Sequence, residues 1–125
     1  MLLKDNLYHI LKSEKGEEAC TYILRFSETH SLFKGHFPGS PVLPGVCILQ
    51  IFKELAETDL ADGCSLRYHE IKQCKFLQPI AMTKPVDLTV SLSLKQGGAF
   101  WSLSASLKDE ATLFTTIKAV LTTIQ

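Results

Sequence analysis

Two residues at the start of an apolar stretch have the types and spacing for proton-transfer chemistry beside a carbonyl group. His36 lies in GHFPGSPVLPGVCILQ, residues 35–50, which holds three prolines and three glycines. Such residues stiffen a loop, so we expect His36 to be held in one place. Gly45 is expected in the first turn of the following helix, where unpaired N–H groups and the positive end of the helix dipole attract an oxyanion. This pattern indicates an acid or base next to an activated carbonyl such as a thioester.

A purely structural interpretation of the same loop is also open, since segments rich in Pro and Gly can serve only to turn the chain. The density of restricted residues around His36 favours the functional interpretation. The other three histidines lack this setting. His9 and His69 fall in strand patterns, where we expect surface or hydrogen-bonded side chains. His30 shares the loop with His36, but its own spacing indicates no role.

The hydrophobic pattern predicts the elements that must position these residues. We expect one helix over residues 46–61, with Pro44 suited to its first turn and Gly63 to its end. Strands are expected over 7–12, 19–28, 65–80, 86–94 and 99–107, with a last strand after the turn at 108–110. One helix cannot cover both faces of a parallel sheet. The sequence therefore predicts an α+β chain in which a curved, mostly antiparallel sheet wraps around one long central helix, the hotdog fold. The exposed edges of such a sheet favour dimerisation.

The expected helix has an uneven distribution of charge. Its first two turns are apolar nearly all round, and its charged residues come later: Lys53, Glu54, Glu57 and Asp59. This pattern predicts a helix that is buried at its start and solvated at its end, with Glu54 at the beginning of the solvated part.

Length and composition exclude several classes of protein. A chain of 125 residues is the size of one domain, which we place at 1–125. Lys plus Arg and Asp plus Glu each number 13, and this neutrality argues against nucleic acid as a partner. No apolar run is long enough for a membrane span, and the charged N-terminal segment MLLKDNLYHI does not resemble a signal peptide. We therefore expect a soluble cytoplasmic protein.

The four cysteines do not indicate a metal site. They are Cys20, Cys47, Cys64 and Cys74. None forms a C-x-x-C pair or has a histidine at the spacing of zinc ligands. We expect four free thiols packed as small apolar side chains. Cys47 is near His36 in sequence, but spacing alone cannot identify a Cys/His nucleophile pair.

The segment HFPGSPVLPGVCILQ resembles the signature of the bacterial β-hydroxyacyl-(acyl carrier protein) dehydratases of the FabZ and FabA type, which reads H-F-x-G-x-P-x-x-P-G before a helix. CKFLQPI, residues 74–80, resembles the family's strand beside the acyl tunnel. The resemblance implies a hotdog dimer that removes water from a 3-hydroxyacyl group on a phosphopantetheine arm, in fatty-acid or polyene-type biosynthesis. It also implies that His36 acts on the α-proton and that Gly45 donates its N–H to the thioester carbonyl.

The sequence departs from this family at residue 50. The resemblance places a glutamate or aspartate there, acting in the other subunit's site, and this chain has Gln50. An amide hydrogen-bonds a hydroxyl or a water but does not transfer protons, and positioned proton transfer is typically worth about 10²–10⁴-fold in rate. Glu54 lies one turn further along the helix and could replace the acid only for a substrate bound deeper.

Three functions remain compatible with the sequence. The chain could be an active dehydratase in which His36 handles both proton transfers and Gln50 orients the hydroxyl or water. It could instead be a non-catalytic subunit that pairs His36 with the acid of a paralogue in a mixed dimer. It could also be a hotdog thioesterase, in which Gln50 positions a water, since the fold hosts both activities. The loop motif favours the dehydratase.

The resemblance also implies substrate and partners. The expected substrate-contacting residues are Phe37, Gly39, Pro44, Phe76 and Leu77, and Leu49 and Phe52 could line the same tunnel or simply belong to the core. The acyl group would arrive on an acyl carrier protein or on coenzyme A, with no cofactor or metal held by the chain. An acidic carrier needs a basic docking surface, for which charge suggests Lys34, Arg67, Lys72 and Lys75, although each could be an ordinary solvated side chain. The oligomer could be a homodimer, a trimer of dimers or a heterodimer with a paralogue.

Overall fold

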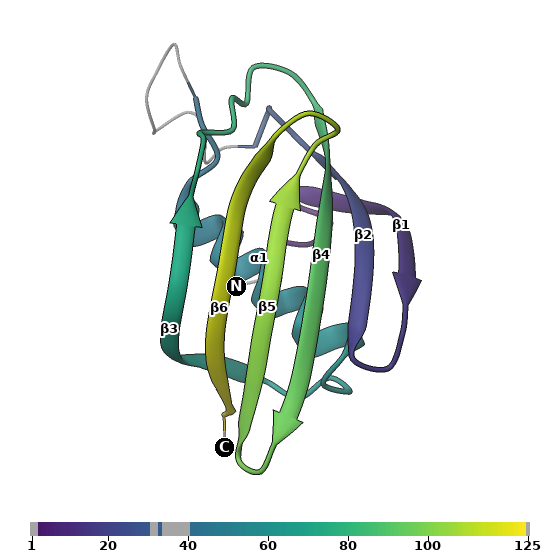
Figure 1. Cartoon of the computed structure of the whole chain (residues 1–125). Coiled ribbons are helices and arrows are strands. Elements are labelled where there is room, and N and C mark those ends of the chain that lie inside the picture. The colour runs from purple at the N-terminus through teal and green to yellow at the C-terminus, as the bar shows by residue number, and fades with distance from the viewer. Residues whose placement is uncertain (1–2, 31–32, 34–40, 125) are drawn as a thin grey trace.

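The computed structural model describes residues 3–30, 33 and 41–124. Within them one antiparallel sheet, with strand order β1-β2-β4-β5-β6-β3, curls around one helix (Figure 1). The elements are β1 (Tyr8–Lys15), β2 (Ala19–Phe26), α1 (Gly45–Asp59), β3 (Leu66–Phe76), β4 (Val86–Gly97), β5 (Phe100–Lys108) and β6 (Leu113–Thr123). This arrangement confirms the predicted α+β hotdog fold. No helix among the described residues has both the length and the apolar content to cross a membrane.

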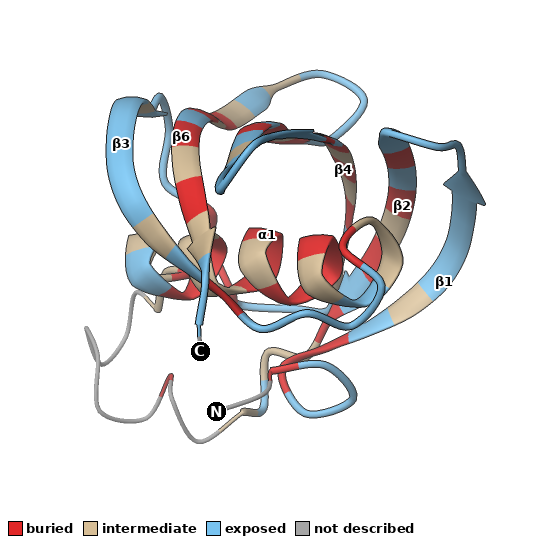
Figure 2. Cartoon of the chain, turned by 90° about the horizontal axis from the view of Figure 1, so that it is seen from below, coloured by how far each residue is buried: buried red, intermediate tan, exposed pale blue. Residues whose placement is uncertain are grey.

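The core lies between the concave face of the sheet and α1, as the buried residues in Figure 2 show. Alternation in β4 and β5 turns one side chain in two toward the helix. Leu94 of β4 faces Leu103 of β5, which in turn faces Ala119 of β6, and all three are buried. The helix contributes fully buried Phe52 to this layer. Each such large apolar side chain contributes about 1.5–3 kcal/mol when it leaves water.

The predicted strand 65–80 is too long, because β3 ends at Phe76. Pro79 has no N–H for a sheet ladder, and the chain leaves β6 after the Leu77 N–H donates to the Phe114 carbonyl at 2.7 Å. Residues 80–82 instead pair with residues 41–43. The Leu43 N–H donates to the Ile80 carbonyl at 3.0 Å, and the Met82 N–H donates to the Pro41 carbonyl at 2.9 Å. This pairing fixes the chain just before α1 begins.

The predicted burial of the helix start is confirmed for Cys47, Ile48, Ile51 and Phe52, but it fails at Val46 and in the later turns. Val46, in the first turn, is 75% exposed. Glu54 is 4% exposed, and the Asp59 side chain accepts a hydrogen bond from the Tyr22 hydroxyl at 2.6 Å and pairs with the Lys15 ammonium at 2.8 Å. The acids of the last turns are buried because the N-terminal segment and the strands supply donors to them.

The start of β6 and one of the cysteines are less buried than their apolar character suggests. Leu113, the first residue of β6, is 42% exposed, and the first buried position of the strand is Thr115. All four cysteines are free, but only Cys20 and Cys47 are buried. Cys64 is exposed because it follows Gly63, a turn residue with a φ of 79° that leaves the helix toward β3.

Candidate functional site

The N-terminus of α1 has few hydrogen-bond partners among the described residues. Pro44 is the N-cap residue, and its carbonyl accepts hydrogen bonds from the N–H groups of Cys47 at 3.1 Å and Ile48 at 3.3 Å. No side chain in the described part of the chain caps the helix, and the first turn of the helix carries no acid. No hydrogen bond among the described residues uses the Gly45 N–H. Unpaired N–H groups at the positive end of the helix dipole suit a carbonyl oxygen that develops negative charge.

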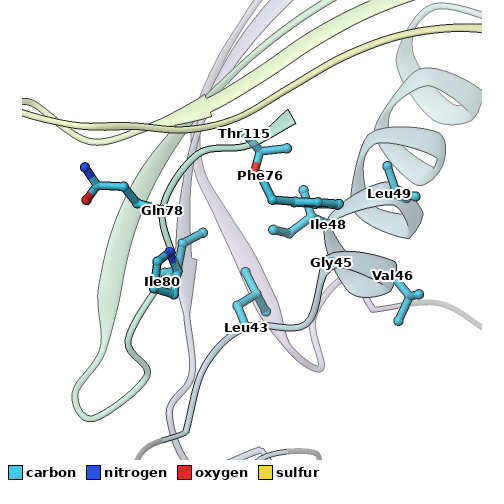
Figure 3. Close-up of a pocket in the computed structure, with 10 residues that line it drawn as sticks. Leu43, Gly45, Val46, Ile48, Leu49, Phe76, Gln78, Ile80 and Thr115 are labelled. Atoms are coloured by element: carbon cyan, nitrogen blue, oxygen red, sulfur yellow. The ribbon is translucent and has the colours of Figure 1, made fainter. Parts of the chain in front are cut away.

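Gly45 is needed here for a reason that the sequence did not reveal. A Cβ built on Gly45 would lie 2.7 Å from Cζ and 3.0 Å from Cε1 of Phe76. The aromatic ring, which comes from the last residue of β3, therefore packs directly on the first residue of the helix (Figure 3). Any ligand whose oxygen approaches the Gly45 N–H must also meet the Phe76 ring, and the binding of a carbonyl by this N–H stays a prediction.

A pocket of about 540 Å³ opens at this point, within the range of about 300–1,000 Å³ that small-molecule sites occupy. Its walls come from the helix start, from the end of β3 and from the two segments that pair before α1. The lining residues are Leu43, Gly45, Val46, Ile48, Leu49, Phe76, Gln78, Pro79, Ile80 and Thr115. Most are apolar, so the pocket suits an acyl chain better than a sugar or a nucleotide.

Thr115 gives the apolar pocket a polar group. The residue is 1% exposed, and its Oγ1 has no hydrogen-bond partner among the described residues. Figure 3 shows the hydroxyl oxygen on the side that faces Phe76. An unpaired buried hydroxyl costs about 1–3 kcal/mol, so a polar atom of a ligand would satisfy a group that is otherwise unfavourable.

Gln50 lies away from this pocket. It lies five positions after Gly45, which places the two about 140° apart around the helix axis. Its Nε2 donates a hydrogen bond to Glu54 Oε2 at 2.9 Å. Gln50 and the Gly45 pocket thus lie on different faces of one chain. The expectation that residue 50 serves the partner subunit's site stays a prediction.

Glu54 is not the solvated residue that the sequence predicted. Its carboxylate accepts hydrogen bonds from the N–H of Leu3 at 2.9 Å and of Lys4 at 3.1 Å, and from the Tyr8 hydroxyl at 3.4 Å. Burial, followed by the charge of Glu54, raises the pKa of Tyr8 above its usual value. Glu54 therefore fastens the N-terminal segment and β1 to the middle of the helix.

The other predicted site residues are distributed as follows. Leu49 and Phe76 line the pocket, Leu77 is half-exposed beside it, and Phe52 belongs to the core. His36, Phe37, Gly39 and Lys34 lie outside the described residues. The remaining docking candidates, Arg67, Lys72 and Lys75, are all exposed on β3.

Thr115 and Gln78 line the pocket but were not predicted from the sequence. Thr115 shares its parity with Ile117 and Leu121 along β6, and this signal could have identified a polar residue at an inward position. Gln78 follows the end of β3 and had no such signal.

Nucleophilic thiol and metal chemistry are not supported among the described residues. Burial raises the pKa of the Cys47 and Cys74 thiols above the usual value, which opposes formation of a thiolate. No group of three or more His, Cys, Asp or Glu side chains in the described part of the chain is placed to hold a metal ion.

The sequence is similar to known dehydratases. Residues 12–115 match the ApeI-like family, described as ApeI dehydratase. The chain is 33% identical over 97 residues to the 3-hydroxyacyl-[acyl-carrier-protein] dehydratase FabZ of Latilactobacillus sakei subsp. sakei, covering 74% of this chain and 66% of that protein. It spans about half the length of other curated FabZ relatives, 50% and 54% in two cases.

Two solved structures resemble the whole described fold. One chain of the dehydratase heterocomplex ApeI:P from Xenorhabdus doucetiae superimposes with a TM-score of 0.74 at 23% identity, covering 91% of this chain and 96% of that one. An uncharacterized protein from Erwinia carotovora subsp. atroseptica gives a TM-score of 0.69 at 30% identity, with coverage of 94% and 98%.

Proposed function

The chain belongs to the ApeI-like dehydratase family, and from this premise we propose that it removes water from a 3-hydroxyacyl thioester. The observation that carries the proposal is the start of α1, which no side chain of the described residues caps, at the mouth of an apolar pocket. Such a site can hold a thioester carbonyl at the Gly45 N–H while an acyl chain lies against Ile48, Leu49 and Ile80. The acyl group would be carried on the phosphopantetheine arm of an acyl carrier protein or on coenzyme A, so the chain needs no cofactor of its own.

The proposed reaction can be balanced without a carboxylic acid at residue 50. His36 takes the proton from C2, and negative charge moves to the thioester oxygen, where the Gly45 N–H stabilises it. The C3–O bond then breaks, and His36, now protonated, returns its proton to the leaving hydroxyl. The products are a 2-enoyl thioester and water. Gln50 of the partner subunit hydrogen-bonds the hydroxyl or the water and transfers no proton.

The exposed surface of β3 supports the proposed partners. This edge strand carries Arg67, Lys72 and Lys75, which suit an acidic carrier protein. Ile71 on the same strand is 44% exposed, and Phe76 is 53% exposed. An unpaired edge with exposed apolar side chains suits pairing with β3 of a second copy, which would form a dimer with a continuous sheet.

A non-catalytic subunit is the second candidate, and the contact between Gln50 and Glu54 favours it. Residue 50 of this chain is an amide that is already bound to a carboxylate of its own helix. In a mixed dimer, His36 of this chain would work with the acid of a paralogue, and one of the two sites would be competent. A similar solved chain comes from a dehydratase heterocomplex.

Mass spectrometry of a 3-hydroxyacyl-carrier thioester separates these functions. The purified chain, its Gln50→Glu variant and a mixture with an acid-bearing homologue are assayed side by side. Loss of water with the chain alone supports the dehydratase, and loss of water only in the mixture supports the mixed dimer. Release of free carrier thiol without loss of water would instead identify a thioesterase and overturn the proposal.

A further inference from the structure

Glu54 is a buried carboxylate that the proposed reaction leaves unused. It lies one helical turn beyond Gln50, and its two oxygens accept hydrogen bonds from backbone and side-chain donors. The Leu3 N–H contacts both oxygens, at 2.9 and 3.0 Å, so the carboxylate is fixed in place. Oε2 therefore accepts from Leu3 on one side and from Gln50 Nε2 on the other, at 2.9 Å.

This contact sets the orientation of the Gln50 amide. A carboxylate only accepts hydrogen bonds, so the amide nitrogen must face Glu54 and the amide oxygen must point away from it. From this geometry we infer that Glu54 is a positioning residue, which turns the carbonyl oxygen of residue 50 toward the site that residue 50 is proposed to serve in the partner subunit. This inference rests on the proposed function for its role in the reaction. A carbonyl oxygen at that point accepts the hydrogen of the substrate hydroxyl and leaves the hydroxyl oxygen available for the proton from His36.

The same contact would change the pKa of a carboxyl group placed at residue 50. A Gln50→Glu variant would place a second carboxylate about 3 Å from that of Glu54, and two like charges so close share one proton. The acid of the single variant therefore has a higher pKa than the acid of Gln50→Glu/Glu54→Gln, which lacks the neighbouring carboxylate. The other charged or titratable groups around the pocket beside Glu54 are Lys4, Tyr8, Lys15 and Asp59, and they are the same in both variants.

A nuclear magnetic resonance experiment tests the orientation without any assay of turnover. The Gln50 side-chain amide signals, identified by their absence in Gln50→Leu, are compared in wild type, Glu54→Gln and Glu57→Gln. Glu57 is the matched control, because its carboxylate lies on the same helix and accepts from Lys53 and from the Leu66 N–H instead. We expect the Gln50 signals to shift in Glu54→Gln and to stay in place in Glu57→Gln. Unchanged signals in Glu54→Gln would overturn the inference.

A second measurement covers the case in which Glu54→Gln does not fold, since Glu54 also anchors the N-terminal segment. In wild-type protein, the Gln50 Nε2 hydrogens and the Leu3 amide hydrogen point at the same oxygen. We expect a strong nuclear Overhauser contact between them. Its absence would mean that the amide has the other orientation, and the inference would fail.

The activity arm compares the pH–rate profiles of Gln50→Glu and Gln50→Glu/Glu54→Gln. We expect the pH above which activity falls to be higher for the single variant, because the carboxyl group at residue 50 stays protonated up to a higher pH. Identical profiles would contradict a coupling between the two residues. If no variant removes water while the resonance results hold, the proposed function fails and the orientation of Gln50 stands.

Discussion

The packing of Phe76 on Gly45 makes a quantitative prediction about the mouth of the pocket. A Gly45→Ala side chain would meet Phe76 at 2.7 Å, which is closer than van der Waals contact allows. Overpacking of this kind costs about 1–3 kcal/mol, and replacing glycine by alanine in a helix returns up to about 1 kcal/mol. Since Phe76 is 53% exposed, its ring can move partly aside. We expect a net loss in the free energy of unfolding of about 0.5–2 kcal/mol.

The cause is isolated by a double-mutant cycle. In a Phe76→Ala background the added methyl group has space, so we expect Gly45→Ala to be neutral or stabilising there, with a coupling energy of about 1–3 kcal/mol. Urea denaturation of the four proteins measures this energy. Gly97→Ala provides the control, because a Cβ at Gly97 meets no atom within 4 Å and should not couple to Phe76.

Turnover separates packing from chemistry in the same four proteins. If the Gly45 N–H binds the thioester carbonyl, the added methyl group hinders the approach of the carbonyl in both backgrounds. Gly45→Ala should therefore reduce kcat/KM whether or not Phe76 is present. Additive stabilities, within about 0.5 kcal/mol, would refute the packing argument. Full recovery of turnover in the double variant would refute the role of the N–H.

Three further predictions follow from the described contacts. Thr115→Val should raise the free energy of unfolding by about 1 kcal/mol, because it removes a buried hydroxyl that has no partner among the described residues. The control Thr116→Val should have little effect. A destabilised Thr115→Val protein in thermal melts would show that the hydroxyl is hydrogen-bonded. Ile71→Lys should dissociate the proposed dimer in sedimentation experiments. Leu11→Lys, which is similarly exposed on the opposite edge strand, should not. An unchanged mass for Ile71→Lys would place the interface elsewhere. The three tyrosines all have pKa values raised chiefly by burial, so the stability they contribute is present below about pH 10 and is lost as pH rises above it. Phenolate absorbance should therefore rise together with loss of circular dichroism, and a rise near pH 10 in protein that is still folded would contradict this.

The sheet could be predicted from sequence because alternation is a local property. Residues 86–94 alternate apolar and polar side chains, and the alternate apolar positions of β4 and β5 are the ones that the structure buries. The extent of β3 could not be predicted in the same way. Residues 77–80 have strand-like composition, but residues 80–82 pair with residues 41–43, which are distant in sequence.

The helix shows why the remaining contacts of the site could not be predicted from the sequence. Charged residues in its second half predicted a solvated end, yet the donors that bury Glu54 and Asp59 come from Leu3, Tyr22 and other distant positions. Apolar residues in its first turn predicted burial, yet Val46 faces outward at the pocket. Local composition gives the polarity of a side chain, but its partners come from tertiary structure.

The most direct test of the central claim is exchange of the substrate α-proton, because this step needs His36 and Gly45 but not an acid at residue 50. A 3-hydroxyacyl-carrier thioester is incubated with the protein in D₂O and analysed by mass spectrometry. The account predicts deuterium at C2 of the recovered substrate, or formation of the enoyl product, and loss of both signals in His36→Ala. Wild-type protein that gives neither signal, or His36→Ala that gives both, would contradict a dehydratase-type site in this chain.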